Sequence, residues 1–119
     1  MSISNRRTGK YDKLINATDD DIRGIVESEI KRFGVHANLN HVLVDEVTDI
    51  SCLFRDLDFD GDISQWNVGK VTDMSYAFER STFNGDISDW SVRNVRKHDH
   101  CFDGSPLEQQ PNKQPKFNP

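Results

Sequence analysis

The sequence lacks the apolar runs that export or membrane insertion requires. The first seven residues are polar or basic apart from Met1 and Ile3, and no apolar segment follows that could form a signal peptide or a lipoprotein anchor. No stretch approaches the roughly 20 apolar residues of a membrane-spanning helix. These absences predict a cytoplasmic protein with no membrane partner, and a surface role only if a leader was removed.

The motifs of common enzyme classes are also missing. The chain has no nucleophile elbow, no glycine-rich phosphate loop and no pair of carboxylates beside a credible base. We therefore expect no enzymatic activity and no cofactor. The 119 residues, of which 34% are hydrophobic, allow one domain with a thin core.

A repeat of 24 residues dominates what is present. Residues 47–70 align with residues 71–94: Val-Thr-Asp-Ile returns as Val-Thr-Asp-Met, and Phe-Asp-Gly-Asp-Ile-Ser returns as Phe-Asn-Gly-Asp-Ile-Ser. A fixed period of this size predicts stacked coils in which equivalent residues lie above one another. The stacking of Trp66 on Trp90 inside a shared apolar core is the central expectation.

The apolar spacing within each repeat indicates a local structure. Residues 39–47, 63–71 and 87–95 all read apolar-x-x-apolar-x-apolar-x-x-Val, close to the L-x-x-L-x-L template of leucine-rich repeats. The alternation around Trp66 favours a strand, and the spacing of four between Met74 and Phe78 favours a short helical segment. The predicted fold class is an α/β repeat solenoid, a short leucine-rich-repeat-like coil with parallel strands and an N-terminal capping helix.

The repeated unit resembles that of the BspA-like leucine-rich-repeat family, whose unit is V-T-D-M-S-x-x-F-x-x-x-x-F-N-x-D-I-S-x-W-x-V. The match runs from Val71 to Val92, with a near copy from Val47 to Val68. It covers about residues 37–108, as a short member with two full repeats plus caps. The resemblance implies a right-handed solenoid and a surface or adhesion role, and it implies no chemistry.

The segments outside the repeats complete the predicted organisation. Residues 1–17 are basic and are expected to be flexible, whereas residues 109–119 are rich in proline and polar residues and are expected to be disordered. Residues 18–108 form the single predicted domain. Its capping helix, residues 18–34, has Thr18 as its N-cap and Gly34 as its stop. The apolar stripe of this helix comprises Ile22, Ile25, Val26, Ile30 and Phe33.

The two cysteines fit a reducing compartment. Cys52 and Cys101 fall in different repeat positions two coils apart, about 10 Å distant if coils stack about 4.8 Å apart. That separation exceeds the reach of a disulfide, so we expect free cytosolic thiols.

A strand face built from the repeats would present three rows of outward side chains. Solenoids commonly bind partners on such a face. The predicted partner-binding residues are His41, Leu43, Gln65, Asn67, Asp89, Ser91 and Arg93, and the rows also include Asp45 and Gly69. Trp66 and Trp90 are assigned to the core.

One group of carboxylates resembles a calcium loop. Asp56, Asp58 and Asp60 precede Gly61 as in the opening of an EF-hand. The twelfth position holds Asn67 instead of a bidentate glutamate, and no long helices flank the segment. We interpret the segment as a turn, with weak calcium binding left open and no other metal expected.

Charge and size leave three functions open. The first is a non-enzymatic module that binds another protein. The second is a small acidic inhibitor from a phage or mobile element that blocks a nucleic-acid-handling protein, because residues 18–94 carry sixteen acidic and seven basic residues. The same balance argues against direct nucleic-acid binding. The third is a structural repeat fragment that forms a homodimer.

Overall fold

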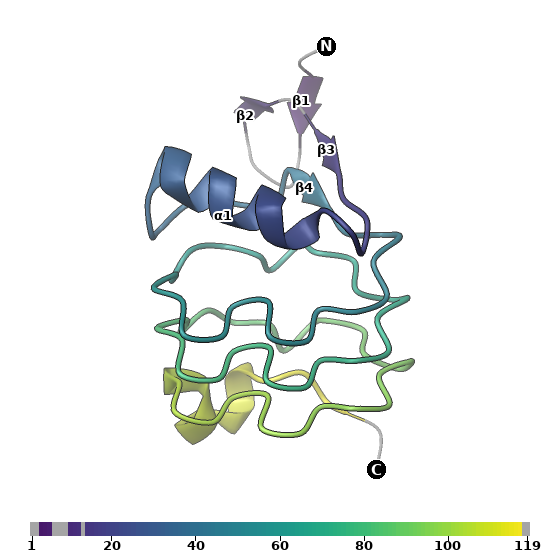
Figure 1. The fold of residues 1–119 in the computed structure, drawn as a ribbon, viewed down its shortest axis with the longest axis vertical. Coiled ribbons are helices and arrows are strands. Elements are labelled where there is room, and N and C mark those ends of the chain that lie inside the picture. Colours follow the sequence, from purple (N-terminus) through teal and green to yellow (C-terminus); the bar gives the residue numbers. More distant parts are fainter. Residues whose placement is uncertain (1–2, 6–9, 13, 118–119) are drawn as a thin grey trace.

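The computed structural model describes residues 3–5, 10–12 and 14–117. Helix α1 and two small sheets occupy one end of the molecule, and the rest of the chain passes back and forth in layers below them (Figure 1). One sheet is antiparallel and the other parallel. The elements are β1 (Ile3–Asn5) paired with β2 (Lys10–Asp12), β3 (Ile15–Asn16) paired with β4 (Val42–Leu43), α1 (Ile22–Phe33), and the 3₁₀ segments η1 (Pro106–Gln109) and η2 (Pro111–Lys113).

Helix α1 covers the first layer as expected, but it begins four residues later than predicted. Asp21 precedes its first residue, and the Asp21 carboxylate accepts a hydrogen bond from the Thr18 backbone N–H at 2.7 Å. Gly34 ends the helix with φ of 95°, a conformation that glycine adopts without a steric penalty. The predicted apolar stripe is buried at Ile22 and Val26, whereas Phe33 is 54% exposed.

The apolar-x-x-apolar spacing forms turns rather than strands. The carbonyl oxygen of Ile63 accepts from the N–H of Trp66 at 3.1 Å, and that of Val68 accepts from Val71 at 3.0 Å. Each hydrogen bond closes a four-residue β-turn, with the two apolar residues at its ends. The same paired turns form residues 39–47 and 87–95. A spacing of three therefore places both apolar ends of a turn in the core. The strands predicted for residues 63–71 and 87–95 are wrong, and within residues 39–47 only Val42–Leu43 forms a strand, β4.

Each layer of the molecule consists of one paired-turn segment (39–47, 63–71 or 87–95) and the residues that follow it, and the opposite side of each layer also consists of turns. We call residues 49–57, 73–81 and 97–105 the turn ladder. Its backbone has positive φ at the same two positions of every repeat. These six residues are Cys52, Tyr76 and His100 at one position, and Asp56, Arg80 and Gly104 at the other. Left-handed residues at this spacing are incompatible with a regular helix, so the short helical segment predicted around Met74 and Phe78 is absent.

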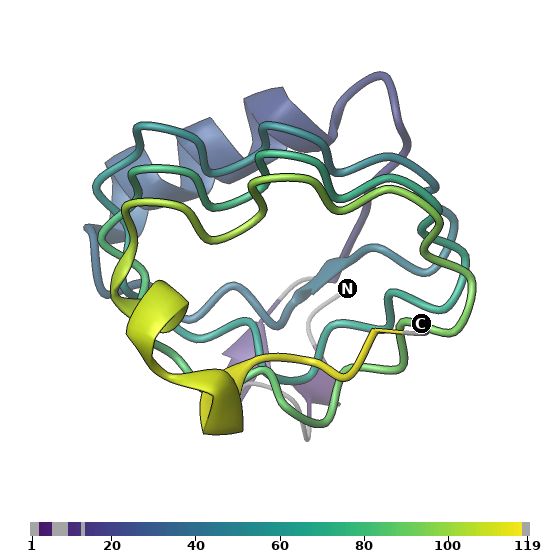
Figure 2. The same cartoon turned by 90° about the horizontal axis from the view of Figure 1, so that it is seen from below.

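Hydrogen bonds between ladder segments all run in one direction. Backbone N–H groups of each segment donate to carbonyl oxygens of the next, at 2.7–3.0 Å. Seen from below, the three segments lie almost directly over one another (Figure 2). The donor–acceptor pairs are Ile50–Asp73, Cys52–Ser75, Phe54–Ala77 and Asp56–Glu79, then Met74–Lys97, Tyr76–Asp99, Phe78–Cys101 and Arg80–Asp103.

The predicted fold class is corrected by these observations. Between residues 44 and 105, all of which the structure describes, the chain forms no helix and no strand beyond isolated bridges. The molecule is small, and its described residues contain one α-helix and one pair of short parallel strands, β3 and β4. A leucine-rich-repeat-like solenoid with a parallel strand in each coil is therefore wrong. The physical reason is the backbone: β-turns and left-handed residues occupy the positions where an extended strand was expected.

The core lies between the paired turns and the turn ladder. Aromatic rings stack there at intervals of 24 residues, with the Phe78 ring centroid 5.1 Å from Phe54 and 5.6 Å from Phe102. Trp66 stacks on Trp90 at 6.2 Å with 10° between the ring planes, so the central expectation about their positions is confirmed. Within the described ranges, no helix has the length and apolar character needed to cross a membrane.

The C-terminal segment closes the far end of this core. Residues 109–117 were expected to be disordered, but the Lys113 carbonyl oxygen accepts a hydrogen bond from Ile87 at 3.0 Å. The Phe117 ring stacks on His98, with centroids 4.0 Å apart. Residues 118 and 119 lie outside the described residues. So do parts of the segment 1–17, whose described residues include three short strands.

Candidate functional site

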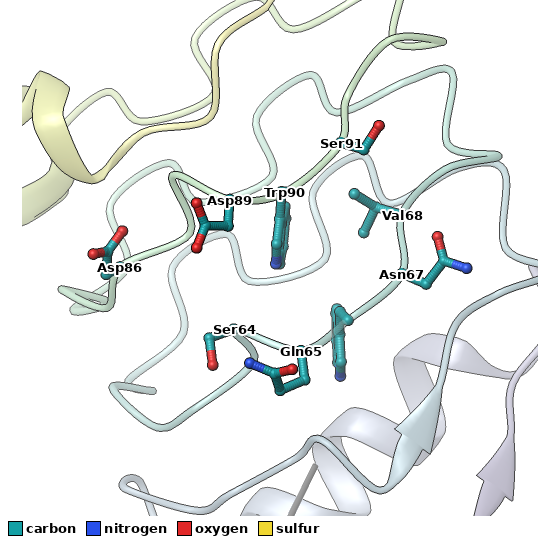
Figure 3. A pocket seen from close by; sticks show the side chains of 9 residues that line it. Ser64, Gln65, Asn67, Val68, Asp86, Asp89, Trp90 and Ser91 are labelled. Atoms are coloured by element: carbon teal, nitrogen blue, oxygen red, sulfur yellow. The ribbon is translucent and has the colours of Figure 1, made fainter. Parts of the chain in front are cut away.

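An open pocket of about 570 Å³ crosses two adjacent layers on the paired-turn side of the molecule. Residues 64–68 supply one wall, and Asp86 with residues 89–91 supplies the other (Figure 3). Both walls consist of β-turns fixed by backbone hydrogen bonds. The pocket is therefore a surface depression between two layers and not an enclosed cavity.

The indole rings of Trp66 and Trp90 form the floor of this pocket. They are only 3% and 5% exposed. Each indole N–H donates to a carbonyl oxygen of the preceding layer: Trp66 to Leu39 at 2.9 Å and Trp90 to Ile63 at 3.0 Å. Because their polar atoms are satisfied and their faces are covered, the two rings fix the shape of the pocket and leave recognition to the rim.

The rim is polar and carries negative charge. Asp86 and Asp89 are both exposed. The Asp86 carboxylate accepts hydrogen bonds from the Ser88 hydroxyl at 2.6 Å and the Ser88 backbone N–H at 3.0 Å. These bonds, the hydroxyl first, lower the pKa of Asp86 below its ordinary value. The rim therefore keeps its charge at neutral pH and attracts basic groups or N–H donors.

Four of the seven predicted binding residues line this pocket: Gln65, Asn67, Asp89 and Ser91. All four are exposed. The turns expose these four side chains on the surface, as the predicted strands would have done, because the residues between the apolar ends of the turns face outward. Leu43 lies in β4 and is half-buried, and Arg93 is exposed but outside the pocket lining.

His41 is not a surface residue, and its assignment to the binding face is wrong. It is 5% exposed, and its Nε2 lies 2.5 Å from the Glu29 carboxylate of α1, which is also buried. The Phe33 ring stands edge-on to His41 at 6.2 Å. In the first layer, α1 covers the position that is open at Gln65 and Asp89 in the later layers.

Sequence reasoning missed Ser64 and Asp86 as parts of the site. In the sequence both belong to the repeated Asp-Ile-Ser motif, in which aspartate can bond to the backbone two residues on. Asp62 and Asp86 do so, each accepting from the serine at that position. The repeated Asp-Ile-Ser motif was the available signal, since it places an aspartate and a serine at the same position of successive layers.

The three carboxylates of the calcium hypothesis bind separate partners. Each accepts a hydrogen bond from the residue 24 positions later, within the next layer. The pairs are Asp56 with the Arg80 guanidinium at 2.5 Å, Asp58 with the Thr82 hydroxyl at 2.9 Å, and Asp60 with the Asn84 backbone N–H at 2.9 Å. Arg80, Thr82 and Asn84, which occupy the equivalent positions of the second repeat, are thus cross-layer partners of the three carboxylates.

The pocket lining consists of carboxylates, amides and hydroxyls around the two indole rings. In the ranges that the structure describes, no three His, Cys, Asp or Glu side chains converge as a metal site. The pocket instead combines two carboxylates with the amides of Gln65 and Asn67. The Asn67 amide also donates to Asp45 at 3.4 Å and accepts from Gly69 at 3.0 Å, which orients it.

Comparison with known proteins yields a family but no characterised relative. No curated protein and no solved structure matches the chain. One family model, described as "Mycoplasma protein of unknown function, DUF285", matches residues 25–117, which include most of α1, all the layers and the C-terminal segment up to Phe117. Since this match extends over most of the sequence, the chain belongs to the DUF285 family.

Proposed function

We propose that this chain is a non-enzymatic protein-binding module that uses the pocket between residues 64–68 and 86–91. The observation that carries the proposal is an open, polar depression on a backbone fixed by turns and cross-layer hydrogen bonds. Such a surface suits recognition of a protein segment, because few groups must lose freedom on binding.

The rim defines the chemistry of the partner. Asp86 and Asp89 would accept hydrogen bonds from arginine, lysine or backbone N–H groups, and Gln65 offers both a donor and an acceptor. The buried indole rings leave no aromatic anchor exposed. We therefore expect moderate affinity and a basic or amide-rich segment as the ligand.

The proposal also includes the cellular compartment in which the module acts and the resemblance of its repeated unit to a known family. A cytoplasmic site of action is part of the proposal and is supported by the two free cysteines, Cys52 and Cys101. The resemblance of the repeated unit to the BspA-like family supports an interaction role, through the residues that the two share.

A photocrosslinker at position 65 tests the proposal in the cell. The full chain carrying benzoylphenylalanine in place of Gln65 should crosslink to a discrete partner, whereas the same group in place of the exposed Lys31 on α1 should not. The purified partner should then bind the Gln65→Ala/Asp89→Ala double variant about tenfold more weakly than the parent chain. Equal binding to both chains would reject the pocket as the interface.

A second candidate function follows from charge. The acidic excess of residues 18–94 includes carboxylates exposed on the layers, such as Asp62 and Asp89. An acidic surface can occupy the basic groove of a nucleic-acid-handling protein and so inhibit it. Co-purification with such a protein that is lost at about 0.5 M salt would support this function. Salt-independent binding of an uncharged partner would argue against it.

A further inference from the structure

The turn ladder ends in a row of backbone donors without acceptors. In its first two segments, the N–H groups at every second position donate to the segment below. The equivalent groups of the third segment belong to His98, His100 and Phe102, and no carbonyl or side chain among the described residues accepts from them. The next N–H in the row, that of Gly104, donates to the Glu108 carboxylate at 3.1 Å.

This edge differs from the edge of an ordinary β-sheet, where donors and acceptors alternate. All eight ladder bonds run from an N–H above to a carbonyl below, so the peptide dipoles of the three segments add. The third segment therefore exposes the positive end of the array. In the third segment His100 and Gly104 have positive φ, and turns that contain left-handed residues can bring backbone N–H groups together to bind negative groups.

Two basic side chains flank the start of the edge, and charged groups of both signs surround it. Arg96, Lys97, Asp99 and His100 are all exposed beside it. The carboxylate of Asp103 is engaged by the His100 ring at 2.6 Å, and this bond raises the pKa of His100. Figure 2 shows the backbone of η1, η2 and the C-terminal segment on the opposite side of the layer from residues 97–103, although the Phe117 ring stacks on the His98 ring.

We propose that this edge binds an extended acidic segment of a partner protein, lying parallel to residues 97–103. The first two segments of the turn ladder show what such a row of N–H groups donates to: carbonyl oxygens of a parallel chain at every second residue. The positive flank formed by Arg96 and Lys97 selects acidic side chains in that segment. The edge is separate from the pocket and does not depend on its function.

A second copy of the chain does not fit this edge. Two copies meeting through their third segments would place donors against donors. The carbonyl edge of the first segment lies beneath α1, where Arg23 donates to the Cys52 carbonyl at 3.1 Å and Asp19 holds Thr48. The homodimer through the thin end that the sequence left open is therefore disfavoured.

Amide hydrogen exchange on the full chain tests the proposal with a defined peptide. The probe carries the sequence of residues 43–57 with serine in place of Cys52. Extended by one 24-residue step, the ladder register would set its Asp49 beneath Lys97. In the free protein the amides of His98, His100 and Phe102 should exchange fast, while those of Tyr76 and Phe78 should exchange slowly. Saturating peptide should slow the first three and leave the others unchanged.

Charge variants and control ligands distinguish the proposed acidic segment from other groups that could bind this edge. The Arg96→Glu/Lys97→Glu variant should bind the peptide about tenfold more weakly than the parent, and Lys31→Glu should bind it equally well. A scrambled peptide should give no protection. Protection of the three amides in the free monomer, protection by inorganic phosphate alone, self-association that protects them, or no protection by the peptide would each overturn the proposal.

Discussion

Asp19 joins the start of α1 to the first layer. Its carboxylate accepts from the Thr48 hydroxyl and backbone N–H, both at 2.7 Å, and from the Asp49 N–H at 3.2 Å. The Thr48 hydroxyl, then the Thr48 N–H, lowers the pKa of Asp19 below 3.8. We predict that Asp19→Ala reduces the free energy of unfolding at pH 7 by at most about 1 kcal/mol, because the carboxylate is near solvent and screened.

The pH dependence of this effect has a defined sign. A carboxyl whose pKa is lower in the folded state stabilises the fold above its unfolded pKa, here near 3.8. The stabilisation is lost as the pH falls through the lower folded value. The difference between the parent and Asp19→Ala in urea unfolding should therefore be constant from pH 7 to pH 5 and shrink below pH 4. Asp20→Ala, a neighbouring exposed carboxylate, is the control, and a difference that grows in acid would contradict the account.

The two thiols should differ in reactivity. Cys101 is 4% exposed, and burial raises the pKa of its thiol to about 12, whereas Cys52 is half-buried. Since the thiolate is the reactive form, we predict that Ellman's reagent modifies Cys52 rapidly at pH 8 and Cys101 only on unfolding. The Cys52→Ser variant should be almost inert until urea is added. Rapid labelling of that variant in its folded state would contradict the burial of Cys101.

At the scale of elements, two glycines give opposite predictions. A Cβ at Gly61 would lie 1.9 Å from the Ala37 carbonyl oxygen and 2.5 Å from the Phe59 ring, so the two layers could not approach. A Cβ at Gly24, in the first turn of α1, would meet nothing within 4 Å. We predict that Gly61→Ala costs about 2 kcal/mol or more and that Gly24→Ala gains up to about 1 kcal/mol. Urea unfolding of both variants measures these changes in the free energy of unfolding. Changes of the same sign in the two variants would contradict the packing.

The phenylalanine column should dominate the stability of the layers. Phe78 is fully buried between the rings of Phe54 and Phe102. We predict that Phe78→Ala lowers the free energy of unfolding by about 3–5 kcal/mol. Phe33→Ala, at the exposed end of α1, should cost less than about 1 kcal/mol. Comparable losses from the two variants in urea unfolding would contradict the proposed core.

The elements differ in how far the sequence predicts them. Helix α1 was predictable because its apolar stripe and Gly34 are signals of local origin. The turn ladder was not, because its left-handed positions carry Cys52, Asp56, Tyr76, Arg80 and His100, with glycine only at position 104. Most of these residue types rarely adopt positive φ, so the conformation is imposed by bonds to neighbouring layers. An apolar spacing of three is likewise shared by helices, strand-containing repeats and β-turns.

For the whole molecule, the 24-residue register was the reliable prediction. It placed the apolar residues of the core correctly, and it placed Gln65, Asn67, Asp89 and Ser91 on one surface, since both follow from the period alone. It failed at His41, where α1 covers the first layer in a way that no repeat position reveals. The unpaired donors of the third ladder segment were also invisible, because backbone polarity depends on φ and ψ and not on side chains.

The contact between the two indoles tests the central claim most directly. If successive layers lie in register, a nuclear Overhauser spectrum of the full chain should show cross-peaks between the ring protons of Trp66 and Trp90. It should also show slow solvent exchange of both indole N–H protons. Rings without mutual cross-peaks, or indole protons that exchange as fast as those of free tryptophan, would contradict the layered core and the pocket built on it.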